Sequence, residues 1–364
     1  MPVVAKSPRL LELVSDGAEC ELLATGFEFT EGPVWSAHER CLYFTDIPGD
    51  VILRYGEEGG IAEWRRPSHM ANGLTLDAAG GLLACEHATS RVTRTAPDGT
   101  ATTLASHYRG RELNSPNDLV VKSDGSVYFT DPLYGRRAGY GVERPPELGF
   151  CGVYRIEPGG GELVLLADDF PAPNGLCFSP DESLLYVNDT HVMHTRVFDV
   201  LPDGTLADGS LFFDEAAHGA RWEEGDPDGI KVDERGNVFC TGPGGVWVIS
   251  PEGEWLGLIE VPEIVANLTW GGPGWSALYI CATRSLYRVQ TRTRGNRVPH
   301  MSARLRMSSS SQSRAEMYGD SSESRLTGAY SVQTAAHPPS AFMPRWRACD
   351  PGFSVPKPVQ WGTW

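Results

Sequence analysis

The sequence predicts an all-β fold built from six similar repeats, and three observations support this prediction. A polar residue, an apolar strand, a turn and a second, mostly aromatic strand recur as one phrase, for example NDLVVKSDGSVYFTD at residues 117–131. The second strand lies 11 or 12 residues after the leading polar residue in every copy. Successive leading residues are separated by 39 to 57 residues, a period typical of β-propeller blades with loop insertions.

The polar residues that begin the phrases are called the leading residues below. They are Glu31, Asn72, Asn117, Asn174, Asp228 and Asn267. A second hairpin follows each of the first five phrases, with turns such as Pro97-Asp98-Gly99 and Pro202-Asp203-Gly204. Asp-Gly and Gly-Gly pairs supply the positive φ angles that tight hairpins need. Each repeat is therefore predicted to hold four antiparallel strands, which makes a six-bladed β-propeller.

The sixth repeat lacks a fourth strand of its own. No strand of similar quality follows Leu286–Val289, whereas Cys20–Thr25 reads as a strand near the N-terminus without a local partner. We predict that Cys20–Thr25 completes the sixth blade, since closing the ring removes an exposed sheet edge.

Three segments are predicted along the chain. Residues 1–18 are a flexible or loosely packed lead-in, residues 19–292 form the propeller, and residues 293–364 form a disordered tail. From residue 291 onwards the chain carries 10 Lys and Arg against 4 Asp and Glu, with a run of four serines and no strand or helix periodicity. Such a composition buries too little apolar surface to offset the entropy of ordering.

The composition excludes several classes of partner. The formal net charge is −16 at pH 7, so nucleic acids and anionic membrane surfaces are repelled. No apolar run approaches the roughly 20 residues of a spanning helix, and the N-terminus lacks the apolar stretch of a signal peptide. The 8 cysteines form no Cys-X-X-Cys pair, and most fall in predicted strands. These features indicate a reduced, cytoplasmic protein.

The leading residues predict a metal site. In a propeller, the loops that enter the innermost strands lie at one mouth of a central channel, so the six leading residues form a ring there. All six carry oxygen acceptors, and Glu31 and Asp228 are ionisable. The alternative is that Asn and Asp recur only as turn residues at strand entrances. Carboxylate and amide oxygens favour one hard divalent cation, Ca²⁺ first and then Mg²⁺ or Mn²⁺, with Zn²⁺ disfavoured by ligand type.

The phrases also resemble a known family. FTEGPVW, NSPNDLVV, YFTDPLYG, PNGLCFS and DPDGIKVD are similar to phrases of the six-bladed propellers of the senescence marker protein, gluconolactonase and luciferin-regenerating enzyme group. ANGLTLDAAGGLLACEHATSRVTR resembles its gluconolactonase branch. The resemblance implies a Ca²⁺-type site and hydrolysis of sugar lactones. The metal ligands that it implies are Glu31, Asn174 and Asp228, with Asn117 added from the diisopropyl-fluorophosphatase-like propellers.

One position departs from the family pattern. In the animal branch an Arg two positions before the third leading residue contacts the sugar, and Ser115 stands there in this chain. The identity of the sugar is therefore left open, whereas the metal site is not affected.

Elementary chemistry suggests how such a site hydrolyses a lactone. The metal would bind the carbonyl oxygen and stabilise the developing oxyanion. A carboxylate would take a proton from the attacking water and return it to the ring oxygen. The resemblance assigns this catalytic role to Asp228, and the alternatives are a metal-bound hydroxide, Asp131 or Glu86.

Further residues are expected to contact the substrate at the channel mouth. The predicted set is Asn72, Glu86, His87, Asn117 and Asp131. Asp131 also echoes Asp46, which ends an equivalent phrase, and this repetition favours a structural role at the strand end. His191 and His194 are predicted to lie on the blade surface or rim.

An insertion in the third repeat has two possible roles. Residues Gly135–Gly149, with Arg136, Arg137 and Arg144, form either a lid over the channel mouth or an ordinary solvated loop.

Three functions remain open on the sequence alone. The first is a divalent-metal lactonase acting on sugar lactones. The second is hydrolysis of phosphotriesters or other esters at the same site. The third is a non-catalytic propeller that binds a metabolite or a protein. The sequence does not fix the oligomeric state.

Overall fold

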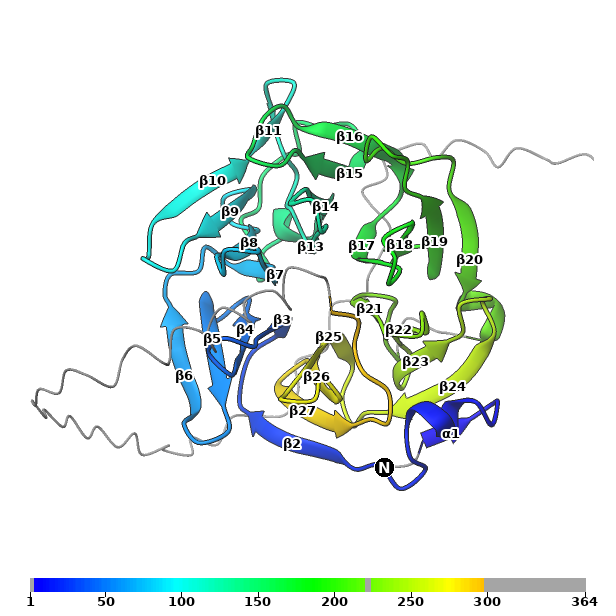
Figure 1. Cartoon of the computed structure of the whole chain (residues 1–364). Helices are drawn as coiled ribbons and strands as arrows, with labels where there is room; N and C mark the ends of the chain where they lie inside the picture. The colour runs from blue at the N-terminus through cyan, green and yellow to red at the C-terminus, as the bar shows by residue number, and fades with distance from the viewer. Residues whose placement is uncertain (1–2, 220–223, 298–364) are drawn as a thin grey trace, which may run out of the picture. The chain divides into compact units, whose positions relative to one another are not determined.

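The computed structural model describes residues 3–219 and 224–297. They form six antiparallel sheets that follow one another around a common centre, as blades of a propeller (Figure 1). The predicted all-β, six-bladed fold is confirmed. In the described part of the chain, no helix has the length and apolar character needed to cross a membrane.

Blades 1 to 3 follow the first three phrases, each with its innermost strand first. Blade 1 consists of β3 (Thr30–Ser36), β4 (Cys41–Asp46), β5 (Val51–Gly56) and β6 (Gly60–Arg65). Blade 2 consists of β7 (Ala71–Leu76), β8 (Leu82–Glu86), β9 (Arg91–Thr95) and β10 (Ala101–Ala105). Blade 3 consists of β13 (Leu119–Val121), β14 (Val127–Asp131), β15 (Cys151–Ile156) and β16 (Val164–Phe170). A small hairpin, β11 (His107–Tyr108) and β12 (Arg111–Glu112), precedes blade 3, and the short 3-10 helix η1 (Tyr134–Arg136) follows β14.

Blades 4 to 6 repeat this order. Blade 4 consists of β17 (Pro173–Phe178), β18 (Leu184–Asp189), β19 (His194–Asp199) and β20 (Ser210–Asp214), followed by the short 3-10 helix η2 (Ala216–His218). Blade 5 consists of β21 (Ile230–Val232), β22 (Val238–Gly242), β23 (Gly245–Ile249) and β24 (Trp255–Glu260). Blade 6 consists of β25 (Val265–Gly271), β26 (Ala277–Ala282), β27 (Ser285–Gln290) and β2 (Cys20–Thr25).

The ring closes as the sequence predicts. Strand β2 pairs antiparallel with β27, with Cys20 opposite Val289 and Thr25 opposite Ser285. Each innermost strand contacts the next one, and β25 of blade 6 contacts β3 of blade 1. The N-terminal strand therefore covers an edge that blade 6 would otherwise expose.

The core lies between neighbouring blades, and the aromatic positions of the phrases supply much of it. Tyr279 of blade 6 stacks on Trp35 of blade 1 with ring centroids 5.5 Å apart. Tyr128 of blade 3 meets Phe178 of blade 4 edge-on at 4.9 Å. Large rings at a fixed place in every repeat fill the wedge between two twisted sheets, which explains why the phrase keeps an aromatic second strand.

Residues 3–18 of the N-terminal lead-in are packed against the propeller, which corrects our expectation of a loosely packed segment for this part of residues 1–18. Strand β1 (Val3–Ala5) pairs with β24 as a fifth strand of blade 5. The short helix α1 (Leu10–Leu13) buries Leu10 and Leu13 in the same core as blades 5 and 6. Isolated short segments give a weak sequence signal, because their order comes from the blade that they cover.

Ordered contacts also continue past the predicted propeller boundary at residue 292. The amide of Arg292 donates to the carbonyl of Leu13 (2.7 Å), and the amide of Asn296 donates to that of Val232 (3.0 Å). The start of the predicted tail is thus part of the propeller unit. The prediction of disorder otherwise concerns residues 298–364, which lie outside the described residues.

The burial of Leu10 leads to a prediction about the stability of the protein. Leu10→Ala should lower the free energy of unfolding by about 2–4 kcal/mol, because it removes a fully buried side chain from a packed core. The matched control is Glu12→Ala in the same helical turn, where the side chain is exposed. Denaturant unfolding followed by tryptophan fluorescence measures both changes. Equal stability of the two variants would contradict the packing described here.

Candidate active site at the entry face

The six leading residues lie where the innermost strands begin, and we call this end of the ring the entry face. Glycine follows the leading residue in four blades, and the next blade leaves no room for a side chain there. The amides of Gly73 and Gly175 donate to the carbonyls of Asn117 (2.8 Å) and Asp228 (3.0 Å) in the following blade. A Cβ atom on Gly175 would overlap that carbonyl oxygen. The recurring Asn-Gly and Asp-Gly pairs are therefore required by close packing of neighbouring strands.

Polar side chains from the second strands fix the main chain of the leading residues. Each of three such side chains donates to the carbonyl of the leading residue in the next blade. The bonds run from Thr45 Oγ1 to Asn72 (3.1 Å), from Thr130 Oγ1 to Asn174 (2.8 Å) and from Asn188 Nδ2 to Asp228 (2.9 Å). Sequence analysis missed this role, although threonine recurs in the YFTD phrases. The leading side chains are thus carried on a rigid frame.

Carboxyl groups are concentrated at this face. Glu31 is 2% exposed and accepts hydrogen bonds from the amide of Gly32 (2.6 Å) and from Asn267 Nδ2 (2.9 Å). Burial, and then the charge of Asp118, raises the pKa of Glu31 to about 7. Burial also raises the pKa of Asp228 well above its ordinary value, and the charge of Glu31 raises it further. These two carboxyl groups therefore repel each other in a poorly solvated place.

Two more acidic residues that sequence analysis missed lie in this cluster. Asp118 and Asp226 both contribute negative charge at Asp228, and burial raises the pKa of Asp226 to about 7. Lys231 contributes one positive charge, with Nζ 3.7 Å from Asp118 Oδ2 and 3.4 Å from Asn267 Oδ1. Four carboxyl groups against this one ammonium group leave an excess of negative charge. The pattern Asp-Pro-Asp-Gly was the available signal for Asp226.

Amide oxygens complete the set of possible ligands. Asn174 donates from Nδ2 to Thr190 Oγ1 (2.8 Å), while its buried Oδ1 has no hydrogen-bond partner in the described part of the chain. The same holds for Oδ1 of Asn72. A buried, unsatisfied oxygen is costly, so such atoms usually serve a ligand. Asn117, also buried, has its main chain fixed on both sides by Thr130 and Gly73.

Asn267, the sixth leading residue, is engaged within the protein. Its amide nitrogen binds Glu31, and its oxygen accepts from the amide of Leu268 (2.8 Å) as well as from Lys231. It therefore orients Glu31 rather than offering an open oxygen.

The donor set suits a hard cation. Among residues 3–219 and 224–297, no three His, Cys, Asp or Glu side chains gather as metal ligands. The candidate set instead combines the two carboxylates Glu31 and Asp228 with the amides of Asn117 and Asn174, and oxygen donors of this kind match Ca²⁺ or Mg²⁺ rather than a soft metal. The unsatisfied oxygen of Asn174 and the mutual repulsion of Glu31 and Asp228 both fit a bound divalent cation.

Two predicted site residues have structural partners instead. Glu86, 1% exposed, is held by Arg65 (3.2 Å) and Arg91 (2.8 Å) and accepts from two threonine hydroxyls. Asp131, fully buried, accepts the amides of Asn114 and Ser115, both at 2.8 Å. Such fully engaged carboxylates have little capacity left for water or substrate. For Asp131 this agrees with the strand-end alternative.

The insertion after β14 reaches other blades, as the lid alternative expects. Two of its arginines bind the protein itself: Arg136 donates to the carbonyl of Asn114 (2.6 Å) and pairs with Glu112 (2.8 Å), and Arg144 pairs with Glu112 as well. Further along, the ring of Tyr140 meets edge-on, at 5.3 Å, that of Phe29, which directly precedes β3 of blade 1. Arg136 and Arg144 therefore anchor the base of a loop that extends over the entry face.

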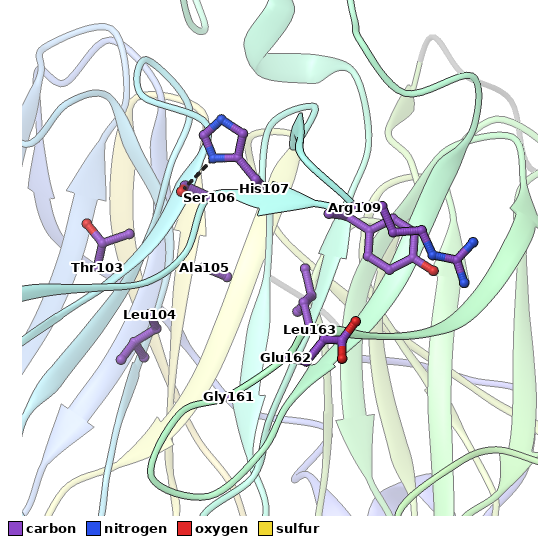
Figure 2. Close-up of a pocket in the computed structure, with 10 residues that line it drawn as sticks. Thr103, Leu104, Ala105, Ser106, His107, Arg109, Gly161, Glu162 and Leu163 are labelled. Atoms are coloured by element: carbon purple, nitrogen blue, oxygen red, sulfur yellow. Dashed lines mark hydrogen bonds between the residues drawn. The ribbon is translucent and has the colours of Figure 1, made fainter.

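A separate cavity lies away from this site. It has a volume of about 350 Å³ and is lined by the end of β10, the β11–β12 hairpin and the turn before β16. Figure 2 shows His107, Arg109 and Glu162 at its wall. None of the leading residues lines this cavity, so it is not the candidate active site.

Comparison with known proteins tests the resemblance. The family model described as the SMP-30/Gluconolactonase/LRE-like region matches residues 29–284 of this chain. This chain belongs to that family. The family suggested by the sequence phrases is thereby confirmed.

Named relatives cover most of the chain. The gluconolactonase of Zymomonas mobilis is 30% identical over 314 residues, which cover 79% of this chain and 86% of that protein. A pentonolactonase of Haloferax volcanii is 27% identical over 273 residues, covering 70% and 82%. The solved structure of a gluconolactonase from Xanthomonas campestris is similar with a TM-score of 0.74 and 33% identity, covering 80% of this chain and 95% of that chain.

The buried carboxyl groups predict an unusual pH dependence of stability. The pKa of Glu31 rises from 4.5 to about 7 on folding, so between these values the folded protein binds more protons than the unfolded chain. Its stability should therefore fall as pH rises through this window, by up to roughly 3 kcal/mol for this one group. Melting temperatures of EDTA-treated protein between about pH 5 and pH 8 measure the effect.

Two comparisons make that measurement specific. Added Ca²⁺ should remove most of the decline, because a cation favours the ionised carboxylates. Glu31→Gln should make the decline less steep without any metal, while Asp226 and Asp228, whose pKa values are also raised, keep part of it. A melting temperature that rises steadily with pH in the EDTA-treated wild type would contradict the raised pKa values.

Proposed function

We propose that the protein is a lactonase that hydrolyses a sugar lactone, with one divalent cation, Ca²⁺ in first place, bound at the entry face. The observation that carries this proposal is the meeting of Glu31, Asp228 and the unsatisfied oxygen of Asn174 at one place. Membership of a family whose relatives include a gluconolactonase and a pentonolactonase supports the substrate class.

The proposed ligands of the cation are Glu31, Asn117, Asn174 and Asp228. A bound divalent cation would polarise the lactone carbonyl and offset the negative charge that develops on its oxygen. The amide nitrogen of Asn267 donates to Glu31, and the amide nitrogen of Asn174 donates to Thr190 Oγ1. The amide oxygen of Asn174 and the second carboxylate oxygen of Glu31 are thereby left for the cation. Side chains of the preceding blades also donate hydrogen bonds to the main-chain carbonyls of Asn174 and Asp228, and these bonds keep the two residues in place.

Asp228 is the proposed general base. Its side chain remains partly accessible, unlike that of Glu31. Coordination to a cation lowers the basicity of a carboxylate, whereas burial and the charges of Glu31 and Asp226 raise the pKa of Asp228. The carboxylate would take a proton from the attacking water and deliver it to the ring oxygen as the ester bond breaks. Glu86 and Asp131, the alternative bases, are less suitable because protein donors already occupy them.

A neutral, polyhydroxylated lactone suits the surroundings of Asp228. The acidic cluster repels anionic substrates, and it would also repel the carboxylate product. Asn72 and Asn117 are proposed to contact substrate hydroxyl groups at the same face. The side chain of Ser115, which replaces the expected arginine, binds the carbonyl of Pro132 (2.6 Å) and so supports the loop rather than the sugar.

A cytoplasmic location is also proposed. Cys85, Cys177, Cys240 and Cys281 are free and buried, and burial raises the pKa of each thiol. Protonated, buried thiols react slowly and are typical of proteins in a reducing compartment.

The central test is hydrolysis of glucono-1,5-lactone. The protein is treated with EDTA, and turnover above the spontaneous rate is then followed with a pH indicator after Ca²⁺, Mg²⁺, Mn²⁺ or Zn²⁺ is restored. We expect metal-dependent turnover with Ca²⁺ among the effective ions, because oxygen ligands favour hard cations. A folded protein that hydrolyses a fluorophosphate ester but no lactone would overturn the proposal in favour of the ester hydrolase. Absence of turnover on both would favour the binding module.

The role of Asp228 gives a second test. Asp228→Asn should lower kcat by about 10²- to 10⁴-fold, because an amide cannot accept the proton from water. The fold should survive, since the main chain of Asp228, which Asn188 and Gly175 of blade 4 bind, is unchanged in this variant. The matched control is Asp226→Asn, which alters the same acidic cluster and should cost far less. A larger loss in Asp226→Asn than in Asp228→Asn would transfer the base role to Asp226.

A further inference from the structure

His87 connects a leading residue to the loop that extends over the entry face. Its Nδ1 lies 2.8 Å from the carbonyl oxygen of Tyr140, and its Nε2 lies 3.2 Å from Nδ2 of Asn72. The side chain is 1% exposed, so both ring nitrogens depend on these two partners for hydrogen bonds. His87 therefore has no surface free for direct contact with a substrate.

The partners decide which ring nitrogen carries the proton. A carbonyl oxygen only accepts, so Nδ1 must be the protonated nitrogen. Burial lowers the pKa of His87 to about 4, and the ring is therefore neutral near pH 7 with an unprotonated Nε2. An unprotonated nitrogen only accepts, so the amide nitrogen of Asn72 must face it.

This arrangement fixes the direction of the Asn72 oxygen. With Nδ2 turned to His87, Oδ1 faces the opposite way and is buried without a hydrogen-bond partner among the described residues. The amide cannot flip, because a neutral Nε2 gives an amide oxygen nothing to accept. Asn72 thus holds one strong acceptor at the entry face, where a hydroxyl group would satisfy it.

The loop is packed closely on the same histidine. A Cβ atom on Gly135 would lie 2.6 Å from His87 Cβ and 2.7 Å from Ser115 Cβ, so a glycine is required for the loop to approach. The amide of Gly135 also donates a hydrogen bond to Oγ of Ser115 (2.9 Å). His87 is therefore enclosed between blade 2 and the loop from blade 3.

We propose that His87 is a positioning residue that orients Asn72, so that its amide oxygen accepts a hydrogen bond from a hydroxyl group of the lactone, and that ties the loop at Tyr140 over the bound substrate. The inference rests on the proposed lactonase function. It assigns selection of hydroxylated lactones to Asn72 and His87, and it replaces our expectation that His87 contacts the substrate directly.

Two amide variants, each of which replaces only one of the two ring nitrogens, separate the two parts of this role. In His87→Gln, the amide oxygen can take the place of Nε2 and still accept from Asn72, but the bond to Tyr140 is lost. In His87→Asn, the amide nitrogen can take the place of Nδ1 and still bind Tyr140, but Asn72 loses its acceptor. The measurement is kcat/KM for glucono-1,5-lactone divided by kcat/KM for δ-valerolactone, which carries no hydroxyl groups.

The expected results differ between the variants. His87→Asn and Asn72→Ala should each lower this ratio about tenfold, because a hydrogen bond is lost with one substrate only. His87→Gln should keep the ratio within about threefold while raising KM for both lactones, since the loop is released. The control is His107→Gln, an exposed histidine at the separate cavity, which should leave both lactones unaffected.

A failure of the proposed function and a failure of this inference alone would give different results. A folded wild type that is inactive on both lactones would overturn the proposed function and this inference with it. An active wild type whose ratio is left unchanged by both His87→Asn and Asn72→Ala would overturn the inference alone.

A spectroscopic measurement is independent of turnover. Long-range ¹H–¹⁵N correlation spectra of the histidine rings, assigned with His87→Gln, should show His87 protonated at Nδ1 only between about pH 6 and pH 8. A proton on Nε2 would require the opposite orientation of Asn72 and would overturn the inference.

Discussion

The structure depends on the close approach of neighbouring innermost strands at the entry face. An amide such as that of Gly73 or Gly175 donates to the carbonyl of the leading residue in the next blade, and no side chain fits between them. This contact places the leading side chains within reach of one another. It also accounts for the glycines in the Asn-Gly and Asp-Gly pairs, which would otherwise look like ordinary turn signals.

Glycine does not follow the leading residue in blades 3 and 6. Asp118 and Leu268 follow the leading residues of blades 3 and 6. Lys231 belongs to β21 of blade 5, and its Nζ lies near both Asp118 Oδ2 and Asn267 Oδ1. The ammonium group offsets part of the negative charge of the cluster, but four buried or partly buried carboxyl groups remain costly without a further cation. Burying these carboxyl groups lowers the stability of the fold, and such a cost is typical of a ligand-binding site rather than of a purely structural ring of residues.

The hydrogen bonds within the protein distinguish two kinds of residue at the entry face. Some have all their polar atoms bound by other protein groups, whereas others keep an oxygen atom that a ligand could bind. Glu86 and Asp131 looked like channel-lining carboxylates, yet arginines and main-chain amides occupy them. Asn267 uses both ends of its amide within the ring. Asn72 and Asn174 each use only the nitrogen, so that an oxygen remains. Spacing along the chain could not make this distinction, because it depends on partners from other blades.

The sequence by itself determined the number of blades, their strands, closure by Cys20–Thr25 and the face on which the leading residues lie, because period and alternation are local properties of the chain. It also indicated the family through phrases that recur in order. Only the tertiary structure decided that residues 3–14 pack on blade 5, that His87 serves Asn72 and the loop, and that Asp118, Asp226 and Lys231 join the cluster. These outcomes arise from contacts between segments far apart in the chain, for which a single sequence carries no periodic signal.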